Sequence, residues 1–373
     1  MNSHMKISPG IIKDFSFKHR KFYNKPFACE IKSGVHQGAT GFSVGEDKSK
    51  VLKSAIGEHS ERLASVKSNI KNTGHNDENP QLTAFNLLNG STIKIPAYTV
   101  LLDFNLPIFQ SVPISVKESF FSDSCGFAAH NKGQLAIENG FLEFIERQSL
   151  IHMWLTKMGA KQILVDEIKN MNLKTNIEFY KQSLDKFMIF NISFIKNVYV
   201  ICTIGYFKNA FSIGVSADFE YEKAIRGSIN EFSMILQSSL TKNSMDICGN
   251  NQLLYNQNES NLYAMNFYET DVNSFIEEYQ FLFTSSEKFN SIDNETGDFY
   301  YILSNLKLIY DIDVYSINID VPLEFNRTKI VKVISPSCYP HMNTSLFDPE
   351  EYPISRKIPA NGFPNKYKPV LFA

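Results

Sequence analysis

The sequence predicts an α+β fold, a single domain in which helices cover mixed, mainly antiparallel sheets. Three stretches rich in β-branched and aromatic residues, 187–195, 198–207 and 211–216, follow one another with short connections, which is typical of antiparallel neighbours. Elsewhere, apolar helices follow glycine-containing stretches in a pattern that recurs along the chain, which indicates pseudo-repeated strand–helix units. Such units bury a common core between layers of helix and sheet.

Each element is expected from its local pattern. Asp47 is a plausible N-cap for a helix, and the apolar stripe of residues 140–155 predicts another that starts at residue 131 or 132. By the same reasoning, helices are expected over 47–70, 220–240 and 272–283, and strands over 95–102, 300–303, 314–320 and 329–335.

Domain organisation is expected to be simple, because no internal boundary stands out. Residues 1–40 show no clear period and form an N-terminal segment, whose first four residues (1–4) look like an expression scar. The main domain covers residues 41–373. It includes an Asn-rich loop over 243–261 and a proline-containing tail over 336–373, which we expect to lie extended against another part of the molecule.

Composition limits the classes of partner. A hydrophobic content of 43% with 20% charged residues describes a globular protein. The net charge of −2 supplies no positive field for nucleic acid or an anionic membrane, and no apolar run reaches the roughly 20 residues of a membrane-spanning helix. The five cysteines lack metal-ligand spacing, which favours reduced thiols. We therefore expect a cytoplasmic protein without a nucleic-acid or membrane partner.

The helix over residues 140–155 carries the first chemical signal. Glu143 and Glu146 stand one turn apart, and Arg147 lies four residues after Glu143. Carboxylates in such an apolar helix are costly unless they are paired, and one arginine cannot neutralise two of them. Either the acids face water on an exposed helix face, or a cation lies between them.

A second copy of the motif favours the hypothesis that a cation lies between the acids. Glu58, Glu61 and Arg62 repeat the E-x-x-E-R spacing, and both copies follow glycine-containing stretches. A third, partial echo runs from Gly214 to Ala217 and on to Glu231. Facing copies would bring four carboxylates and two guanidiniums together, a set that favours Mg²⁺ with phosphate. The chain has no conventional phosphate loop, so a bound nucleotide would depend on metal and carboxylates.

The two motifs together resemble those of the YcaO family. The first reads S-x-x-x-E-x-x-E-R from Ser54, and the second begins at Asn131 and continues as an Ala-Ile helix that ends in E-x-x-E-R. Segments 148–155 and 334–343 resemble the cyclodehydratase subunits of microcin-type azole synthetases. The resemblance implies one YcaO domain that binds ATP and Mg²⁺ between its pseudo-repeated parts.

The resemblance also implies a reaction and a site. A Cys, Ser or Thr side chain of a ribosomal precursor peptide attacks the preceding amide carbonyl, and ATP phosphorylates the amide oxygen so that phosphate leaves and a thiazoline or oxazoline remains. The residues expected to bind the metal are Glu58, Glu61, Glu143 and Glu146. Those expected to bind the nucleotide are the same four together with Ser54, Arg62, Asn131 and Arg147.

Two positions depart from the family pattern, and the catalytic base is open. Leu135 stands where many relatives have another acid, and the chain ends in residues 368–373 with a single proline instead of a P-x-P-x-P tail. His341 is the candidate base, although a lone histidine is more often structural.

The resemblance further implies partner subunits. Family members recognise the precursor peptide through a subunit related to ubiquitin-activating enzymes, and a flavin dehydrogenase, which holds FMN, oxidises the azolines. The 31 Phe and 17 Tyr residues predict a large core or a subunit interface. Two other hypotheses stay open, a YcaO enzyme that forms thioamides or amidines and a non-catalytic YcaO scaffold.

Overall fold

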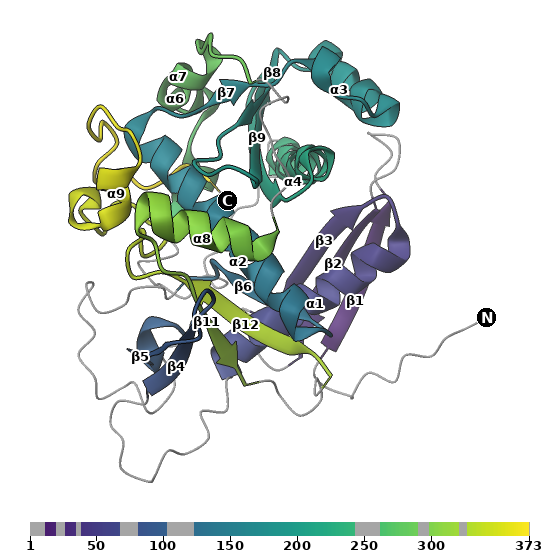
Figure 1. Cartoon of the computed structure of the whole chain (residues 1–373). Coiled ribbons are helices and arrows are strands. Elements are labelled where there is room, and N and C mark those ends of the chain that lie inside the picture. The colour runs from purple at the N-terminus through teal and green to yellow at the C-terminus, as the bar shows by residue number, and fades with distance from the viewer. Residues whose placement is uncertain are drawn as a thin grey trace.

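Within the part of the chain that the structure describes, the strands form three antiparallel sheets (Figure 1). The computed structural model describes residues 12–19, 27–34, 39–67, 81–102, 123–242, 262–289, 298–320 and 327–372; the predicted loop 243–261 and residues 1–4 lie outside them. The first sheet has the order β1 (Ile12–His19), β2 (Phe27–Ser33), β3 (Gly41–Gly45). The second has the order β5 (Thr92–Pro96), β4 (Gln81–Asn86), β11 (Tyr315–Ile319), β12 (Lys329–Ile334), β6 (Phe127–His130). The third has the order β10 (Ala210–Asp218), β9 (Tyr199–Phe207), β8 (Lys186–Asn191), β7 (Lys161–Gln162).

One edge strand of each sheet leads into a long helix. We call these pairs unit one, β3 with α1 (Lys48–Lys67), unit two, β6 with α2 (Gly133–Thr156), and unit three, β10 with α4 (Tyr221–Lys242). Helix α2 runs through the centre of the molecule, between the β7–β10 sheet and the sheet that contains β6 (Figure 1). The other helices are α3 (Met171–Ser183), α5 (Leu262–Glu269), α6 (Val272–Glu278), α7 (Gln280–Phe283), α8 (Phe299–Tyr310) and α9 (Pro353–Lys357).

A glycine lets strand and helix approach closely in each unit. A methyl group at Gly41 would overlap the backbone oxygen of Ala55, and one at Gly214 would overlap that of Ser228. In unit two, Gly126 precedes β6, and a methyl group at Gly140 of α2 would come within 2.9 Å of the Gly126 oxygen. The close contact joins residues 14 apart in all three units. The pseudo-repeat expected from the sequence is therefore a repeat of packing geometry.

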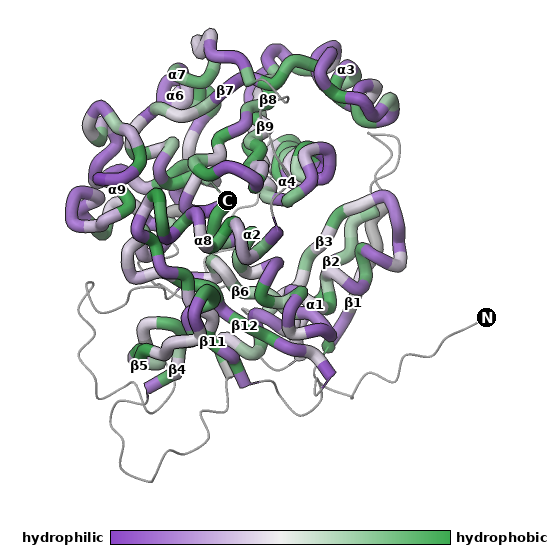
Figure 2. Tube along the Cα trace, in the orientation of Figure 1, coloured by the Kyte–Doolittle hydropathy of each residue, from purple (hydrophilic) through white to green (hydrophobic). Residues whose placement is uncertain are grey.

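The main core surrounds α2. Trp154 is 1% exposed, its ring centroid lies 5.4 Å from that of Tyr279, and its indole N–H donates to the Lys368 carbonyl at 3.2 Å. Tyr279 in turn donates from its hydroxyl to the Leu371 carbonyl at 2.7 Å. Figure 2 shows hydrophobic positions along α2 and β9, whereas α9 at the periphery is largely hydrophilic. These contacts hold the C-terminal residues against the central helix.

Most predicted elements are present, with small shifts at their ends. The expected α+β fold with mainly antiparallel sheets is confirmed. Asp47 caps α1 as predicted, since its carboxylate accepts the N–H groups of Ser49 and Lys50 at 2.8 and 3.1 Å. Residues 12–19 and 27–33, for which no period was evident, form β1 and β2 of the same sheet as β3. None of the helices within the described ranges is long and apolar enough to cross a membrane.

Three element predictions were wrong. Residues 300–303 belong to helix α8, which Asp298 caps by accepting the Tyr301 N–H at 2.7 Å; their aromatic content suggested a strand, but buried Ile302 and Leu306 follow helical spacing. The strand expected over 95–102 is β5, which ends at Pro96 because proline cannot donate to the ladder. The tail over 336–373 is not wholly extended, since it contains helix α9, which begins at Pro353. Proline is tolerated at the start of a helix because the N–H groups there have no partner within the helix.

Candidate nucleotide and metal site

The acids of unit one connect α1 to two different strands. Glu58 accepts the Phe42 N–H of its own strand β3 at 2.6 Å, and its other oxygen accepts from Arg62 at 2.6 Å. Glu61 reaches unit two, where it accepts the Ala129 N–H of β6 at 2.6 Å. Burial and the neighbouring Glu58 raise the pKa of Glu61 to about 7. The two carboxylates therefore face the junction between units one and two.

Unit two repeats this arrangement one unit further along. Glu146 accepts the Ala217 N–H of β10 in unit three at 3.0 Å, as Glu61 does from β6. Arg147 lies 3.4 Å from Glu146 and 4.0 Å from Glu143. Burial raises the pKa of Glu143 well above its usual range, and the charges of Glu61, Glu146 and Asp123 add to this rise. Since Glu61 of the first motif is bonded to β6, the strand that leads into the helix of the second motif, the structure brings units one and two together.

Unit three contributes an acid that the motif search did not include. Glu231 of α4 accepts the Val215 N–H of β10 at 2.6 Å. Burial raises its pKa to about 8, and the charges of Arg147, Glu146 and Glu58 act on it. The sequence contained a signal for this residue, because each unit has a glutamate 17 positions after its glycine. The pairs are Gly41 and Glu58, Gly126 and Glu143, and Gly214 and Glu231. The sequence analysis had placed Glu231 in the partial third echo but had not included it among the predicted site residues.

These residues form one group, which we call the carboxylate cluster: Glu58, Glu61, Glu143, Glu146 and Glu231 with Arg62 and Arg147. Five carboxylates against two guanidiniums leave an excess of negative charge when all are ionised. In the described part of the chain, no three His, Cys, Asp or Glu side chains are placed to hold a metal ion by themselves. Mg²⁺ commonly takes one or two carboxylates and completes its shell with phosphate and water, so the oxygen-only donor set fits Mg²⁺ with a nucleotide.

Comparison with known proteins identifies the family. A family model described as YcaO cyclodehydratase, ATP- and Mg²⁺-binding, matches residues 46–338. The chain belongs to the YcaO family. The membership expected from the two motifs is thereby confirmed. A search of curated proteins finds no match.

Solved structures share the fold. A chain of the E. coli microcin synthetase McbBCD complex is 22% identical, with a TM-score of 0.70 and 96% of each chain covered. In the same complex with pro-MccB17 bound, the identity is 21%, the TM-score 0.71 and the coverage again 96% of each chain. YcaO from Methanopyrus kandleri, bound with AMPPCP and Mg²⁺, is 12% identical, with a TM-score of 0.64, and the match covers 87% of this chain and 85% of that chain. At these identities the likeness concerns the fold.

The remaining motif residues lie at the surface beside the cluster. Ser54 is exposed on α1, one turn before Glu58, and Asn131 is exposed just before α2 begins. Lys132, the N-cap of α2, makes no capping hydrogen bond through its side chain, and the first turn carries no acid. Leu135 is partly buried in that first turn, where many YcaO proteins have an acid. A helix start without acids suits a phosphate group.

The candidate base His341 is buried beside Asp123 and Lys332, whereas Ser54 and Asn131 are exposed. His341 is 2% exposed, its Nδ1 accepts the Asn343 N–H at 3.2 Å, and its Nε2 has no hydrogen-bond partner among the described residues. Burial lowers its pKa to about 4. It lines a small space of about 10 Å³, enough for about one water molecule, together with Asp123 and Lys332. His341 is therefore neutral near pH 7 and shielded from bulk solvent.

A buried cation stands beside this histidine, and sequence reasoning missed it. Lys332 of β12 is 1% exposed and donates to the Asp123 carbonyl at 2.6 Å. Its ammonium lies 3.9 Å from the Asp123 carboxylate and 4.6 Å from the centroid of the Phe127 ring. Burial lowers its pKa, whereas Asp123, Cys125 and Glu143 act in the opposite direction. Lys332 thus lies buried beside Asp123, on the strand that pairs with β6. A lone lysine inside an apolar strand gave no signal in the sequence.

The C-terminus lies against the cluster. The ring of Phe372 is 1% exposed, and the Arg147 guanidinium lies 4.8 Å from its centroid. Residues 365–372 pack under α2, where Asn365 donates to the Trp154 carbonyl at 3.1 Å. The expectation that the tail lies against another part of the molecule therefore holds for the described residues, although a single aromatic ring takes the place next to Arg147.

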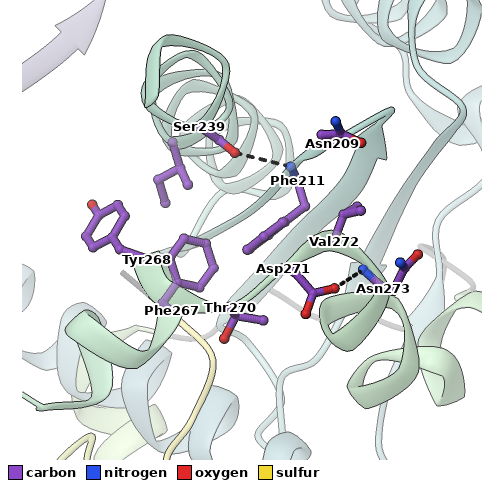
Figure 3. A pocket seen from close by; sticks show the side chains of 10 residues that line it. Asn209, Phe211, Ser239, Phe267, Tyr268, Thr270, Asp271, Val272 and Asn273 are labelled. Carbon is purple, nitrogen blue, oxygen red and sulfur yellow. Dashed lines mark hydrogen bonds between the residues drawn. The ribbon is translucent and has the colours of Figure 1, made fainter. Parts of the chain in front are cut away.

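A second, larger cavity lies away from the carboxylate cluster. It has a volume of about 300 Å³ and lies between the start of β10, the second half of α4, and helices α5 and α6 (Figure 3). Its aromatic lining includes Phe211 and Phe267, and its charged lining residue, Asp271, caps α6 by accepting the N–H groups of Asn273 and Ser274. None of the predicted nucleotide residues lines it. Since none of the described lining residues is cationic, this part of the structure is poorly suited to a nucleoside triphosphate.

Proposed function

We propose that this protein is an ATP- and Mg²⁺-dependent peptide cyclodehydratase that converts Cys, Ser or Thr residues of a ribosomal precursor peptide into thiazolines or oxazolines. The observation that carries the proposal is the carboxylate cluster, in which both YcaO motifs meet around an excess of negative charge. Membership in a YcaO family that binds ATP and Mg²⁺ supports the same conclusion.

Each side chain has a role in this proposal. Glu58, Glu61, Glu143 and Glu146 hold the metal and thereby the phosphate groups. The backbone bonds to Phe42, Ala129 and Ala217 fix three of these carboxylates, so little reorganisation is needed on binding. Arg62 and Arg147 face phosphate oxygens, while Ser54 and Asn131 contact the nucleotide from the exposed edge.

The proposed reaction takes place at one amide bond of the precursor peptide. The peptide side chain adds its sulfur or oxygen to the amide carbon and loses its proton. The amide oxygen then leaves with the transferred phosphoryl group as inorganic phosphate, while the amide nitrogen loses its proton and forms the C=N bond of the azoline. Bound ATP with Mg²⁺ supplies the phosphoryl group that turns a poor leaving group into a good one. The protein contributes positioning and charge shielding to this step.

His341 stays our candidate for the proton acceptor. Its ring lines the small space beside Lys332, and the ring is neutral at neutral pH because burial lowers its pKa. A neutral imidazole can accept a proton, although a low pKa makes it a weak base. His341→Gln should leave ATP affinity unchanged and lower the rate of cyclisation. Equal rates for the variant and the wild type would assign His341 a structural role.

We further propose that the enzyme works in the cytoplasm within a microcin-type azole synthetase. Its partners would be the precursor peptide, a leader-recognition subunit related to ubiquitin-activating enzymes, and an FMN-containing dehydrogenase. Helix α8 supports this by exposing Tyr300, Leu308 and Ile309 at 63%, 83% and 58% of their surfaces. Exposed apolar side chains on one helix are typical of a subunit contact.

Mass spectrometry of a precursor peptide, co-expressed with this chain and its genomic neighbours, tests the function. Loss of one water per modified residue supports azoline formation, and a further loss of two hydrogens supports the dehydrogenase partner. Replacement of oxygen by sulfur would show a thioamide enzyme, and gain of an amidine ring would show amidine formation. An unmodified peptide in the presence of all partners would support the scaffold hypothesis, which Leu135 at a usual acid position makes worth testing.

A further inference from the structure

The cavity at the start of β10 has an aromatic inner wall (Figure 3). Phe211 and Phe267 are 5% and 2% exposed, and their ring centroids lie 5.1 Å apart. Phe211 also stacks on Phe275 at 4.2 Å, so packing holds the wall in place, and Ile235 of α4 adds an aliphatic surface. The volume of about 300 Å³ lies at the lower end of the range of ligand-binding pockets.

One carboxylate stands at the rim of this cavity. Asp271 is exposed at the start of α6, where its Oδ1 accepts the N–H groups of Asn273 and Ser274 at 2.8 and 3.1 Å. Its Oδ2 accepts from the Ser274 hydroxyl at 2.7 Å. The Ser274 hydroxyl and the N–H groups hold the pKa of Asp271 below its usual range, so the group is ionised at neutral pH. Because a carboxylate oxygen has two lone pairs, Oδ2 can accept a further hydrogen bond.

The charge of the lining points to a cationic ligand. Among the described lining residues, Asp271 carries a negative charge and none carries a positive one. Aromatic rings attract a cation to their faces. An arginine side chain suits both features, because its aliphatic stem packs on apolar surface and its planar guanidinium stacks on rings and donates to a carboxylate. A lysine ammonium is more strongly hydrated and fits such a wall less well.

Strand β10 connects this cavity to the carboxylate cluster. Phe211 lines the cavity, whereas Val215 and Ala217 further along the strand donate their N–H groups to acids of the cluster. At a rise of about 3.3 Å per residue, these two residues lie roughly 13 and 20 Å from Phe211 along the strand. An extended peptide rises by a similar amount, so a side chain about four to six residues from the modified residue can span this distance.

We propose that this cavity is a specificity subsite, which binds an arginine side chain of the precursor peptide about four to six residues from the residue that is cyclised. The inference rests on the proposed function for the identity of the peptide. In the subsite, the guanidinium donates to Asp271 and stacks on the aromatic wall, while the stem packs against Ile235.

A binding experiment separates charge from shape. The probes are the capped peptide acetyl-Gly-Arg-Gly-amide and the same peptide with citrulline, which has the shape of arginine without its charge. Ligand-observed NMR should show that the arginine peptide binds the wild type about three- to five-fold more tightly than the citrulline peptide. Asp271→Asn keeps the helix cap, because Asn caps as well as Asp, and removes the charge. The difference between the two peptides should therefore vanish in this variant.

Asp298→Asn is the matched control. Asp298 caps α8 in the same way, by accepting the Tyr301 N–H at 2.7 Å, and it does not line the cavity. This variant should distinguish the two peptides as the wild type does.

A second experiment uses the precursor peptide with all partner subunits present. One precursor carries arginine about five residues from a modified residue, and a matched precursor carries glutamine there. The wild type should show a lower KM and an unchanged kcat for the arginine precursor. Asp271→Asn should raise that KM to the value for the glutamine precursor and leave the ATP affinity unchanged, because Asp271 is not part of the carboxylate cluster.

Equal affinities of the two capped peptides for the wild type, a difference that survives in Asp271→Asn, or equal KM values for the two precursors would each overturn the inference. If cyclisation is normal alongside any of these results, the subsite fails and the proposed function stands. A precursor that stays unmodified counts against the proposed function instead. The capped-peptide measurement needs no turnover, so it still decides whether the cavity binds arginine.

Discussion

Units two and three have the same packing but different chemistry. In both units, a glycine at the strand lies against the helix backbone. In both, a glutamate of the helix, Glu143 or Glu231, stands 17 positions after that glycine. Unit two adds Glu146, which accepts an N–H of unit three, and Arg147, whereas unit three has Met234 and Ile235 in these places. The comparison teaches that the repeat is retained in how strand and helix backbones pack. The second acid and the arginine of the motif determine how a unit contacts its neighbour.

The largest expected effect concerns Phe372, whose ring packs against Arg147. Unit three has Ile235 in place of this arginine. Phe372→Ala removes a buried ring and should cost about 3–5 kcal/mol of the free energy of unfolding. We also expect weaker ATP binding, because Arg147 loses the ring beside it. Thermal unfolding and calorimetry measure both effects. Tyr367→Ala on the same tail, at a residue that is 58% exposed, is the control and should unfold like the wild type.

The second prediction compares equivalent positions in units two and three. Glu146→Gln keeps an acceptor for the Ala217 N–H but removes a charge next to Arg147, so ATP binding with Mg²⁺ should weaken by about 1.5–3 kcal/mol, roughly 10- to 150-fold. Glu61→Gln at the junction of units one and two should do the same. Met234→Gln introduces the same side chain at the matching position of unit three and should leave the affinity unchanged. Similar losses in all three variants would mean that the motif acids have no special role.

The third prediction tests what the units share. Gly41→Ala and Gly214→Ala should each destabilise the fold by about 1–3 kcal/mol or more, because the added methyl group meets helix backbone that cannot move aside. Gly57 on α1 has open space around it, so Gly57→Ala should instead stabilise the protein by about 1 kcal/mol through helix propensity. Urea unfolding of the three variants gives the comparison. Equal stabilities for all three would contradict the close packing of strand and helix.

The smallest effect is a dependence on pH. Burial raises the pKa of Glu61 from 4.5 to about 7 and that of Glu231 from 4.5 to about 8. Between pH 4.5 and about pH 8, the folded state therefore binds more protons than the unfolded state. Stability therefore falls as pH rises through this window. His152 and His341, with pKa values lowered from 6.5 to about 4, give the opposite slope, but only below pH 6.5.

A scan of melting temperature checks this slope. Without metal and nucleotide, the melting temperature should fall by a few degrees between pH 6.5 and pH 8. Saturating ATP with Mg²⁺ should remove most of the fall, because the bound cation favours ionised carboxylates. Glu61→Gln should flatten the metal-free profile. A melting temperature that rises over this window in the metal-free protein would show that the acids are ionised and already paired.

Several parts of the fold followed from local sequence. The 3.6-residue stripe around Trp154 predicted α2, and the short connections predicted the antiparallel β8, β9 and β10. Helix α8 did not follow, because Tyr300 and Tyr301 resemble strand residues in composition and only the Asp298 cap and the burial of Ile302 identify a helix. Aromatic content is a weak guide where a short helix and a strand have similar composition.

The sequence by itself determined the two E-x-x-E-R motifs, their helices and the family, because spacing within a helix fixes which side chains share a face. Only the tertiary structure decided that Glu61 and Glu146 each bond to the strand of the following unit, that Glu231 joins them, and that Phe372 covers Arg147. These contacts join residues 16 to 225 positions apart in the sequence, and packing rather than any local pattern brings them together. Lys332 illustrates the same limit, since its burial beside Asp123 depends on the pairing of β12 with β6.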